Sequence, residues 1–225
     1  MMKKAFTLAE ILITLGIIGV VAAMTIPTLM SNTGKAEFTT AYKKIISAVN
    51  QAVTMSVAID YIDFGDANTG TVTDSIYGIL SKKMQIAKTV VGTNDEVCRM
   101  FKDTNNSCDS SVATNYTLFF ADGMAISYPQ AAAKCTTALY NNTTNASRAN
   151  CKAIVDVNGS KGPNKLSHCD WGDGQDPNKD TDASTGDNDL CTEENAYIAD
   201  HFSVMFKGQQ LVPNGNAARY VLYEK

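Results

Sequence analysis

The sequence predicts an α+β protein in which one long N-terminal helix precedes a head built on a mostly antiparallel β-sheet. Three observations predict this fold: an uncharged apolar stretch from Ile11 to Met30, a helical apolar repeat after it, and strand patterns separated by turns in the second half. With 225 residues, the chain is long enough for one anchor and one domain with its own core.

The apolar stretch has the length of a membrane span. Twenty residues at a helical rise of about 1.5 Å reach roughly 30 Å, which is the thickness of a bilayer core. Lys3 and Lys4 precede it, and basic residues before a span keep that end cytoplasmic. We therefore expect a single-pass membrane protein whose remaining chain is exported.

Three other interpretations compete for this stretch. A secretory signal peptide would be cleaved near Val21–Ala23, but Glu10 lies where such a peptide is apolar. A plain membrane anchor explains the length and leaves Glu10 without a purpose. A buried core helix does not explain the basic flank.

Glu10 is the diagnostic residue of this segment. A carboxylate at or inside a membrane costs several kcal/mol unless it is paired or protonated. Between Glu10 and Lys35 there is no Lys or Arg. The sequence therefore predicts that a cation comes from elsewhere, such as a free α-amino group exposed by cleavage nearby.

The segment KKAFTLAEILITLGIIGVVAAMTIP resembles the N-terminal signal of type IV prepilins and type II secretion pseudopilins. That family has a short basic leader, cleavage before Phe, then Glu, Gly and Pro in fixed register. With Phe6 as the first mature residue, Glu10 falls fifth, Gly19 fourteenth and Pro27 twenty-second. Ala5 departs from the family, which usually has Gly before the cut.

The resemblance implies a leader over 1–5, a membrane and filament-core helix over 6–30, its amphipathic continuation over 31–58 and a pilin-like head over 59–225. It also implies that a prepilin peptidase cuts between Ala5 and Phe6 and that the Phe6 amine is methylated. Loss of the two leader lysines takes the formal charge from −4 to −6.

The implied partners are other pilin or pseudopilin subunits, the prepilin peptidase and an inner-membrane assembly platform. In the filament, Glu10 of one subunit pairs with the Phe6 amine of its neighbour, which favours correct axial register. The implied location is the bacterial inner membrane, then a periplasmic or cell-surface filament. The segment VDVNGSKGPNK with the later LVPNG also resembles pseudopilin heads.

Gly19 and Pro27 bound a segment of weakened helix. Proline removes a helix hydrogen bond and clashes with the preceding turn, and glycine loosens the helix further. The segment either kinks or melts locally on assembly, or it holds a static kink that a membrane helix tolerates.

After Pro27, apolar residues recur at helical steps and predict the amphipathic half of one helix, about 80 Å long from Phe6. They are Phe38, Tyr42, Ile45, Val49, Ala52 and Met55. In the head we expect a helix within Ser75–Lys88 and strands that flank turns at Asp122-Gly123 and Gly208. The predicted strands are Tyr116–Ala121, Met124–Tyr128, Ala153–Val157, His201–Lys207, Gln210–Val212 and Ala218–Tyr223.

Six cysteines and no CxxC pair disfavour structural zinc and favour disulfides in an oxidising compartment. We expect pairing in sequence order, with buried unpaired thiols as the alternative. The predicted pairs are Cys98–Cys108, Cys135–Cys151 and Cys169–Cys191.

The run DWGDGQDPNKDTDASTGDND, from Asp170 to Asp189, carries oxygen ligands at the alternate spacing of a calcium loop. The ligands of this calcium hypothesis are Asp176, Asn178, Asp180, Asp182, Ser184 and Asp187. Thr181 replaces the usual glycine, and the last residue is Asp where a calcium loop has Glu. A solvated acidic loop clipped by Cys169 and Cys191 is the alternative.

Charge and motifs bear on function. A net charge of −4 disfavours nucleic-acid binding. The two histidines, His168 and His201, lack metal-type spacing, and no nucleophile-elbow or phosphate-loop motif appears, so we expect structural histidines and no enzyme. We therefore predict a structural filament subunit. The first alternative is a pilin at the filament tip that binds a surface or a polymer, and the second is a membrane-anchored hydrolase.

Overall fold

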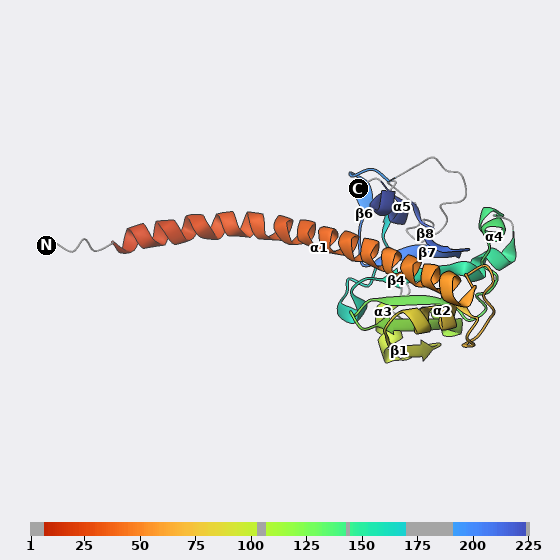
Figure 1. Ribbon diagram of the computed structural model, residues 1–225. Coiled ribbons are helices and arrows are strands. Elements are labelled where there is room, and N and C mark those ends of the chain that lie inside the picture. The colour runs from red at the N-terminus through yellow and green to blue at the C-terminus, as the bar shows by residue number, and fades with distance from the viewer. Residues whose placement is uncertain (1–6, 103–106, 143–144, 170–190, 224–225) are drawn as a thin grey trace. The chain divides into compact units, whose positions relative to one another are not determined.

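The computed structural model describes residues 7–102, 107–142, 145–169 and 191–223, apart from the side chains of 27, 28 and 30–32. These residues form two compact units, Met1–Glu37 and Phe38–Lys225. The fold is α+β, with an apolar N-terminal helix and an antiparallel sheet, as the sequence predicts (Figure 1).

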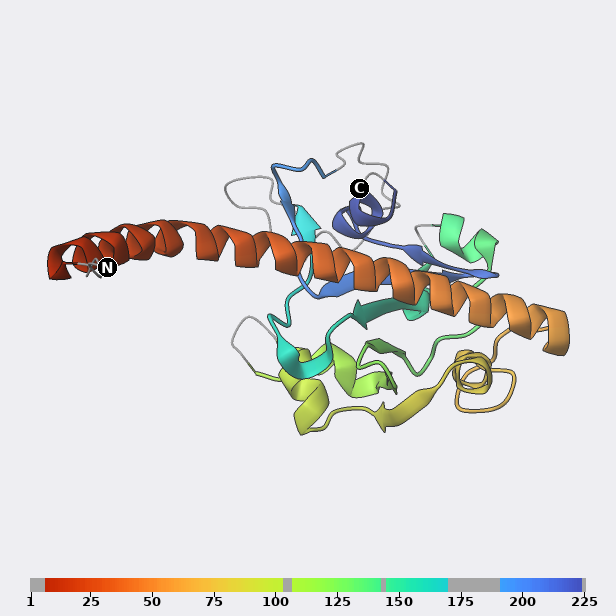
Figure 2. The same cartoon turned by 60° about the vertical axis from the view of Figure 1, so that its left-hand side comes forward.

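Helix α1 runs from Leu8 to Asp60 without interruption, so it passes through both Gly19 and Pro27. In the first unit its apolar side chains are exposed. In the second unit it supplies one side of the core, and Figure 2 shows this half running across the strands.

Six strands form the main sheet, in the order β1-β2-β3-β4-β7-β8, and every neighbouring pair is antiparallel. A second sheet has two short strands, β5 and β6. The strands are β1 (Ile86–Val91), β2 (Asn115–Phe120), β3 (Ala125–Pro129), β4 (Lys152–Asp156), β5 (His168–Cys169), β6 (Ala196–Tyr197), β7 (His201–Lys207) and β8 (Gln210–Pro213).

Short helices fill the connections. They are α2 (Ile76–Lys83), α3 (Asp95–Met100), α4 (Thr137–Asn141) and α5 (Asn216–Tyr223), with 3-10 turns η1 (Ser110–Thr114), η2 (Ala146–Cys151) and η3 (Gly159–Lys161). Side chains cap several of them; Ser75, for example, accepts a hydrogen bond from the Gly78 amide at the start of α2.

The central strands of the sheet are buried on both faces. On one face, α1 contributes Tyr42, whose ring stacks on Phe202 of β7 at a centroid distance of 4.1 Å. On the other, α3 and the residues around it pack on Phe119 and Ala125 in a smaller cluster. Burial on both faces explains why all six residues of β2 are buried instead of every second one.

The amphipathic prediction for α1 is right for most of its face. Tyr42, Ile45, Val49 and Ala52 are buried, and Phe38 is partly buried against the same core. Met55 is 49% exposed, so its assignment to this face is wrong. Because an α-helix has 3.6 residues per turn, repeated steps of three residues move away from the buried face. Ile46, Val53 and Ser56 also lie on the buried face, and they were not included in the predicted set.

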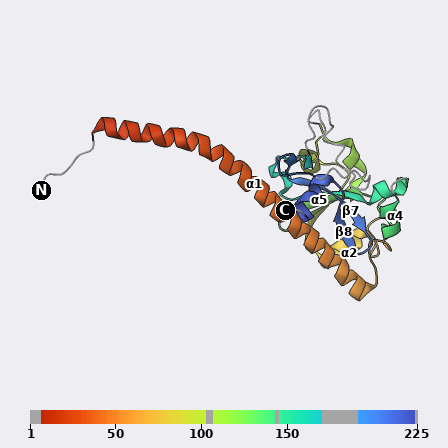
Figure 3. The ribbon, with the colours of Figure 1, turned by 90° about the horizontal axis from the view of Figure 1, so that it is seen from above.

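One prediction for the head is confirmed and another needs correction. The helix expected within Ser75–Lys88 is α2, which ends at Lys83, and the residues from Ile86 to Val91 pair with β2 as a strand. Ala218–Tyr223 is not a strand but the end of α5, beside β7 and β8 (Figure 3). The buried residues of α5 follow helical spacing: Ala217, Ala218, Tyr220 and Val221. Over six residues the sequence does not distinguish this spacing from the alternating pattern of a strand.

The three disulfides pair in sequence order, as predicted, and no described cysteine is free. Cys98–Cys108 ties α3 to the chain before η1, and Cys135–Cys151 ties the chain after β3 to the end of η2. Cys169–Cys191 closes the segment that contains the acidic run.

Asn50 of α1 closes the outer edge of the sheet at β8. Its Oδ1 accepts a hydrogen bond from the Leu211 amide at 2.6 Å, and its Nδ2 donates to the Leu211 carbonyl at 3.5 Å. A strand neighbour makes the same two bonds, so the side chain occupies an edge that is otherwise open to pairing with another chain.

We expect Asn50→Ala to lower the free energy of unfolding by about 1–3 kcal/mol, because it leaves the Leu211 amide without its acceptor. Gln51→Ala is the matched control, since Gln51 is an exposed neighbour whose side chain donates a hydrogen bond to Ser47 in the same helix, and it should change stability by less than about 0.5 kcal/mol. Urea unfolding in detergent measures both; equal effects would contradict the edge role.

Asp60, the last residue of α1, accepts a hydrogen bond from Lys83 of α2 at 3.0 Å. This bond holds the pKa of Asp60 below its usual value of 3.8. A carboxyl whose pKa falls on folding stabilises the fold above its unfolded pKa, and the contribution disappears as the pH drops through the folded pKa.

We therefore expect Asp60→Asn to be less stable than the wild type at pH 7 and equally stable near pH 2. Asp66→Asn, at a nearby exposed aspartate, is the control. Unfolding free energies measured across this range check the prediction, and a deficit that persists unchanged at pH 2 would show that the charge is not its cause.

Candidate assembly site on the N-terminal helix

The first half of α1 is apolar on all sides and is not buried. The window Leu8–Ile26 is long and apolar enough to cross a membrane, and none of it is buried. Exposure of these side chains argues against the buried core helix. The exposed large apolar residues are Leu8, Ile11, Leu12, Ile13, Leu15, Ile17, Ile18, Val20, Val21, Met24, Ile26 and Leu29.

Such a surface needs an apolar environment. Covering a single Val, Leu, Ile or Met side chain stabilises a protein by about 1.5–3 kcal/mol, so these residues together represent some tens of kcal/mol. A helix that is apolar all round is typical of a membrane span or of the centre of a helical assembly.

The only ionisable group in the window is Glu10, in the first turn of α1. The Thr7 amide donates to Glu10 Oε2 at 2.8 Å, and the Thr7 hydroxyl donates to the same oxygen at 2.9 Å. The Glu10 amide donates in return to Thr7 Oγ1 at 3.3 Å. This reciprocal pattern is a capping box, with Thr7 as the N-cap and Glu10 three residues on.

The capping box changes the reasoning about Glu10. The sequence predicts that the carboxylate needs a cation from elsewhere, and this stays a prediction. Within its own chain, two neutral donors satisfy Oε2, and the positive end of the helix dipole favours its charge. Within the described residues Oε1 takes no hydrogen bond, so that oxygen is left for a further partner.

Thr7 is the residue of this candidate site that the sequence analysis did not single out. The signal was present as Thr7-Leu8-Ala9-Glu10, a threonine followed three residues later by glutamate ahead of an apolar run.

The other predicted positions divide into those that the structure describes and those that it does not. Gly19 lies in unbroken helix, and an added Cβ there would meet no atom within 4 Å. Pro27 also lies within α1. Ala5, Phe6 and the calcium hypothesis at Asp176, Asn178, Asp180, Asp182, Ser184 and Asp187 fall outside the described residues.

The two histidines belong to the second unit. The ring of His168, on β5, lies tilted against Tyr197 at a centroid distance of 4.8 Å, and its Nδ1 donates a hydrogen bond to the Leu166 carbonyl at 3.0 Å. His201, at the start of β7, is buried against Asp156.

Comparison of the chain with family models, with curated proteins and with solved structures gave no match.

We expect Thr7→Ala to weaken the first turn of α1 by about 1 kcal/mol, because it removes the N-cap and one donor to Glu10. Thr14→Ala is the control: Thr14 also hydrogen-bonds the backbone, to the Ile11 carbonyl, but lies inside the helix. Amide hydrogen exchange in detergent should be about fivefold faster over Leu8–Leu12 in Thr7→Ala only. Equal protection in the two variants would contradict the capping box.

Proposed function

We propose that the chain is a structural subunit of a type IV pilus-like filament or a type II secretion pseudopilus, and not an enzyme. One observation carries the proposal. The exposed apolar window Leu8–Ile26 contains a single carboxylate, Glu10, near its start, and the spacing of Phe6, Glu10, Gly19 and Pro27 is that of the prepilin signal. A plain anchor needs the apolar length, but it has no use for a carboxylate in that position.

In this proposal the helix has two successive environments. Before assembly it lies in the inner membrane, with residues 1–5 on the cytoplasmic side until a prepilin peptidase removes them. After assembly the same apolar surface is covered by the helices of neighbouring subunits. Both environments satisfy the need for apolar contacts, so transfer from lipid to filament does not expose the helix to water.

Glu10 gives the assembly its register. Its Oε2 is held by Thr7, and Oε1 is available for the Phe6 ammonium of a neighbouring subunit. In an apolar surrounding a misplaced ammonium or carboxylate stays unpaired at high cost, whereas the correct axial offset pairs both. The three disulfides support an exported head, because they form and persist in oxidising compartments.

Replacement of Glu10 tests the proposal. Glu10→Gln should abolish filaments, or reduce them at least tenfold, while the protein still fractionates with the membrane. Glu37→Gln removes an equal charge from an exposed position of α1 beyond the apolar window and should leave assembly unchanged. Electron microscopy and membrane fractionation are the measurements.

Mass spectrometry of the N-terminus completes the test. The mature chain should begin at a methylated Phe6. A chain that begins at Met1, or after Ala23, would overturn the proposal in favour of a plain anchor or a secretory signal peptide. Normal filaments from Glu10→Gln would overturn the role of the carboxylate. Exchange of head domains would then separate a scaffold from a tip subunit that binds a surface.

A further inference from the structure

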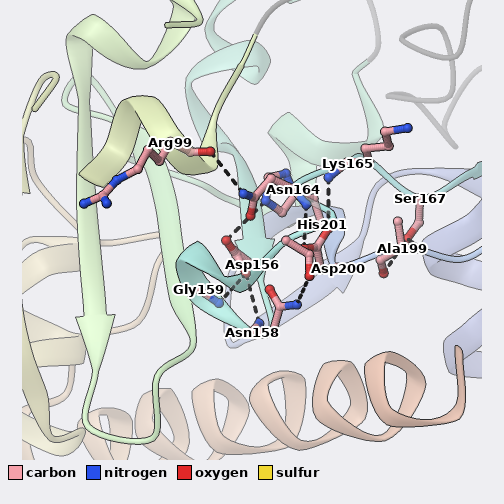
Figure 4. Close-up of polar contacts among 11 residues, drawn as sticks. Arg99, Asp156, Asn158, Gly159, Asn164, Lys165, Ser167, Ala199, Asp200 and His201 are labelled. Carbon is pink, nitrogen blue, oxygen red and sulfur yellow. Dashed lines mark hydrogen bonds and ion pairs between the residues drawn. The ribbon is translucent and has the colours of Figure 1, made fainter. Parts of the chain in front are cut away.

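Two buried aspartates and a buried histidine meet at one end of the sheet (Figure 4). Asp156 ends β4 and pairs in register with His201, the first residue of β7, and Asp200 directly precedes it. One ligand atom from each of the three residues lies within 4.8 Å of the others. Asp156 and Asp200 are fully buried, and His201 is 5% exposed.

The aspartates hold the loop between β4 and β5 through its backbone. Asp156 Oδ1 accepts from the amides of Asn158 and Gly159, at 2.9 and 2.7 Å. Asp200 accepts from the two amides that follow the η3 turn, those of Asn164 at 2.7 Å and Lys165 at 2.9 Å. These donors are neutral, so they leave the two negative charges uncompensated.

The cluster is short of positive charge. Within the described residues, neither aspartate has a Lys or Arg partner, and the imidazole Nε2 of His201 lies 3.2 Å from Asp156 Oδ2. Two carboxylates buried at this separation repel each other strongly in a medium of low dielectric constant. One imidazole supplies at most one of the two charges required.

Two side-chain oxygens beside the cluster also lack a donor. Asn158 Oδ1 and Asn164 Oδ1 are sequestered from solvent without a hydrogen bond. Their nitrogens are used elsewhere, since Asn158 Nδ2 donates to the Gly162 carbonyl at 2.7 Å and Asn164 Nδ2 donates to the Arg99 carbonyl at 3.1 Å. Both asparagines lie on the loop that the aspartates hold (Figure 4). The surroundings are therefore rich in acceptors and suit a cation.

We propose that Asp156, Asp200 and His201 bind one divalent first-row transition-metal ion such as Zn²⁺, with asparagine oxygens completing its surroundings. The imidazole decides the class of ion, because imidazole suits Zn²⁺ and its neighbours, whereas Ca²⁺ and Mg²⁺ take oxygen ligands. The ion replaces the proton between Nε2 and Asp156, so His201 binds as the Nδ1–H tautomer.

The distances fit such an ion after a small adjustment. Ligands about 2.0–2.1 Å from a tetrahedral ion lie roughly 3.3 Å from one another. The 3.2 Å between His201 Nε2 and Asp156 Oδ2 already matches this spacing. The third ligand, Asp200, closes by about 1.5 Å at most or binds through a water molecule. The ion would link the end of β4, the start of β7 and the loop between them.

The full-length chain in detergent tests the site. After treatment with a chelator and loading with Zn²⁺, dialysis should leave one zinc per chain, and the melting temperature should rise with Zn²⁺ but not with Ca²⁺. Asp200→Asn and His201→Gln should bind Zn²⁺ at least tenfold more weakly. His168→Gln is the matched histidine control, and a variant with Asp182→Asn and Asp187→Asn in the acidic run controls for that segment; both should retain the ion.

X-ray absorption at the zinc edge, on the wild-type chain, keeps the test independent of variants that fail to fold. It should show one imidazole nitrogen, oxygen ligands and no sulfur. The proposal is overturned by zinc well below one per chain, by a shell without imidazole, by unchanged affinity in folded Asp200→Asn, or by loss of the ion in the acidic-run variant. None of these outcomes depends on filament assembly.

Discussion

The constraint on which the chain depends is the need to cover an apolar helix that also carries one carboxylate. The window Leu8–Ile26 exposes apolar side chains in every direction, so it requires lipid or other helices around it. Glu10 Oε2 accepts two hydrogen bonds there, from the amide and the hydroxyl of Thr7. The proposed function follows from these two facts together: the apolar surface supplies the driving force for association, and the carboxylate restricts which associations are correct.

The second half of α1 obeys a different constraint, since from Phe38 onward it serves as one wall of the head. Tyr42 stacks on Phe202, and burial raises the pKa of its hydroxyl, so the ring remains neutral in the core. Polar contacts act where this half meets other elements: Asn50 closes the β8 edge and Asp60 pairs with Lys83. Apolar burial thus anchors this half of the helix to the head, and hydrogen bonds from Asn50 and to Asp60 join it to β8 and α2.

The sequence was most informative where a pattern was long or carried a strong turn. The 53-residue helix, the hairpin at Asp122-Gly123 and the sequence-order disulfides were all predicted correctly. Ala218–Tyr223 was not, because helix and strand periods cannot be separated over six residues and tertiary burial decides. The Asp156–His201 pair could not be predicted from the sequence, because the two residues are 45 positions apart and meet only through the register of β4 with β7.

The capping box also changes what a Glu10–ammonium pair contributes in the proposed filament. If Glu10 were unsatisfied in the single subunit, pairing would relieve the whole cost of a buried charge and would act mainly as a driving force. Because Thr7 already satisfies Oε2, pairing with an ammonium relieves only the part of the burial free energy that the capping hydrogen bonds leave. The neutral donors of Thr7 lower the cost of burying the carboxylate without cancelling its charge, so pairing still distinguishes the correct axial offset from a misplaced one. Pairing therefore selects among arrangements of similar apolar contact, so it acts on register more than on the strength of association.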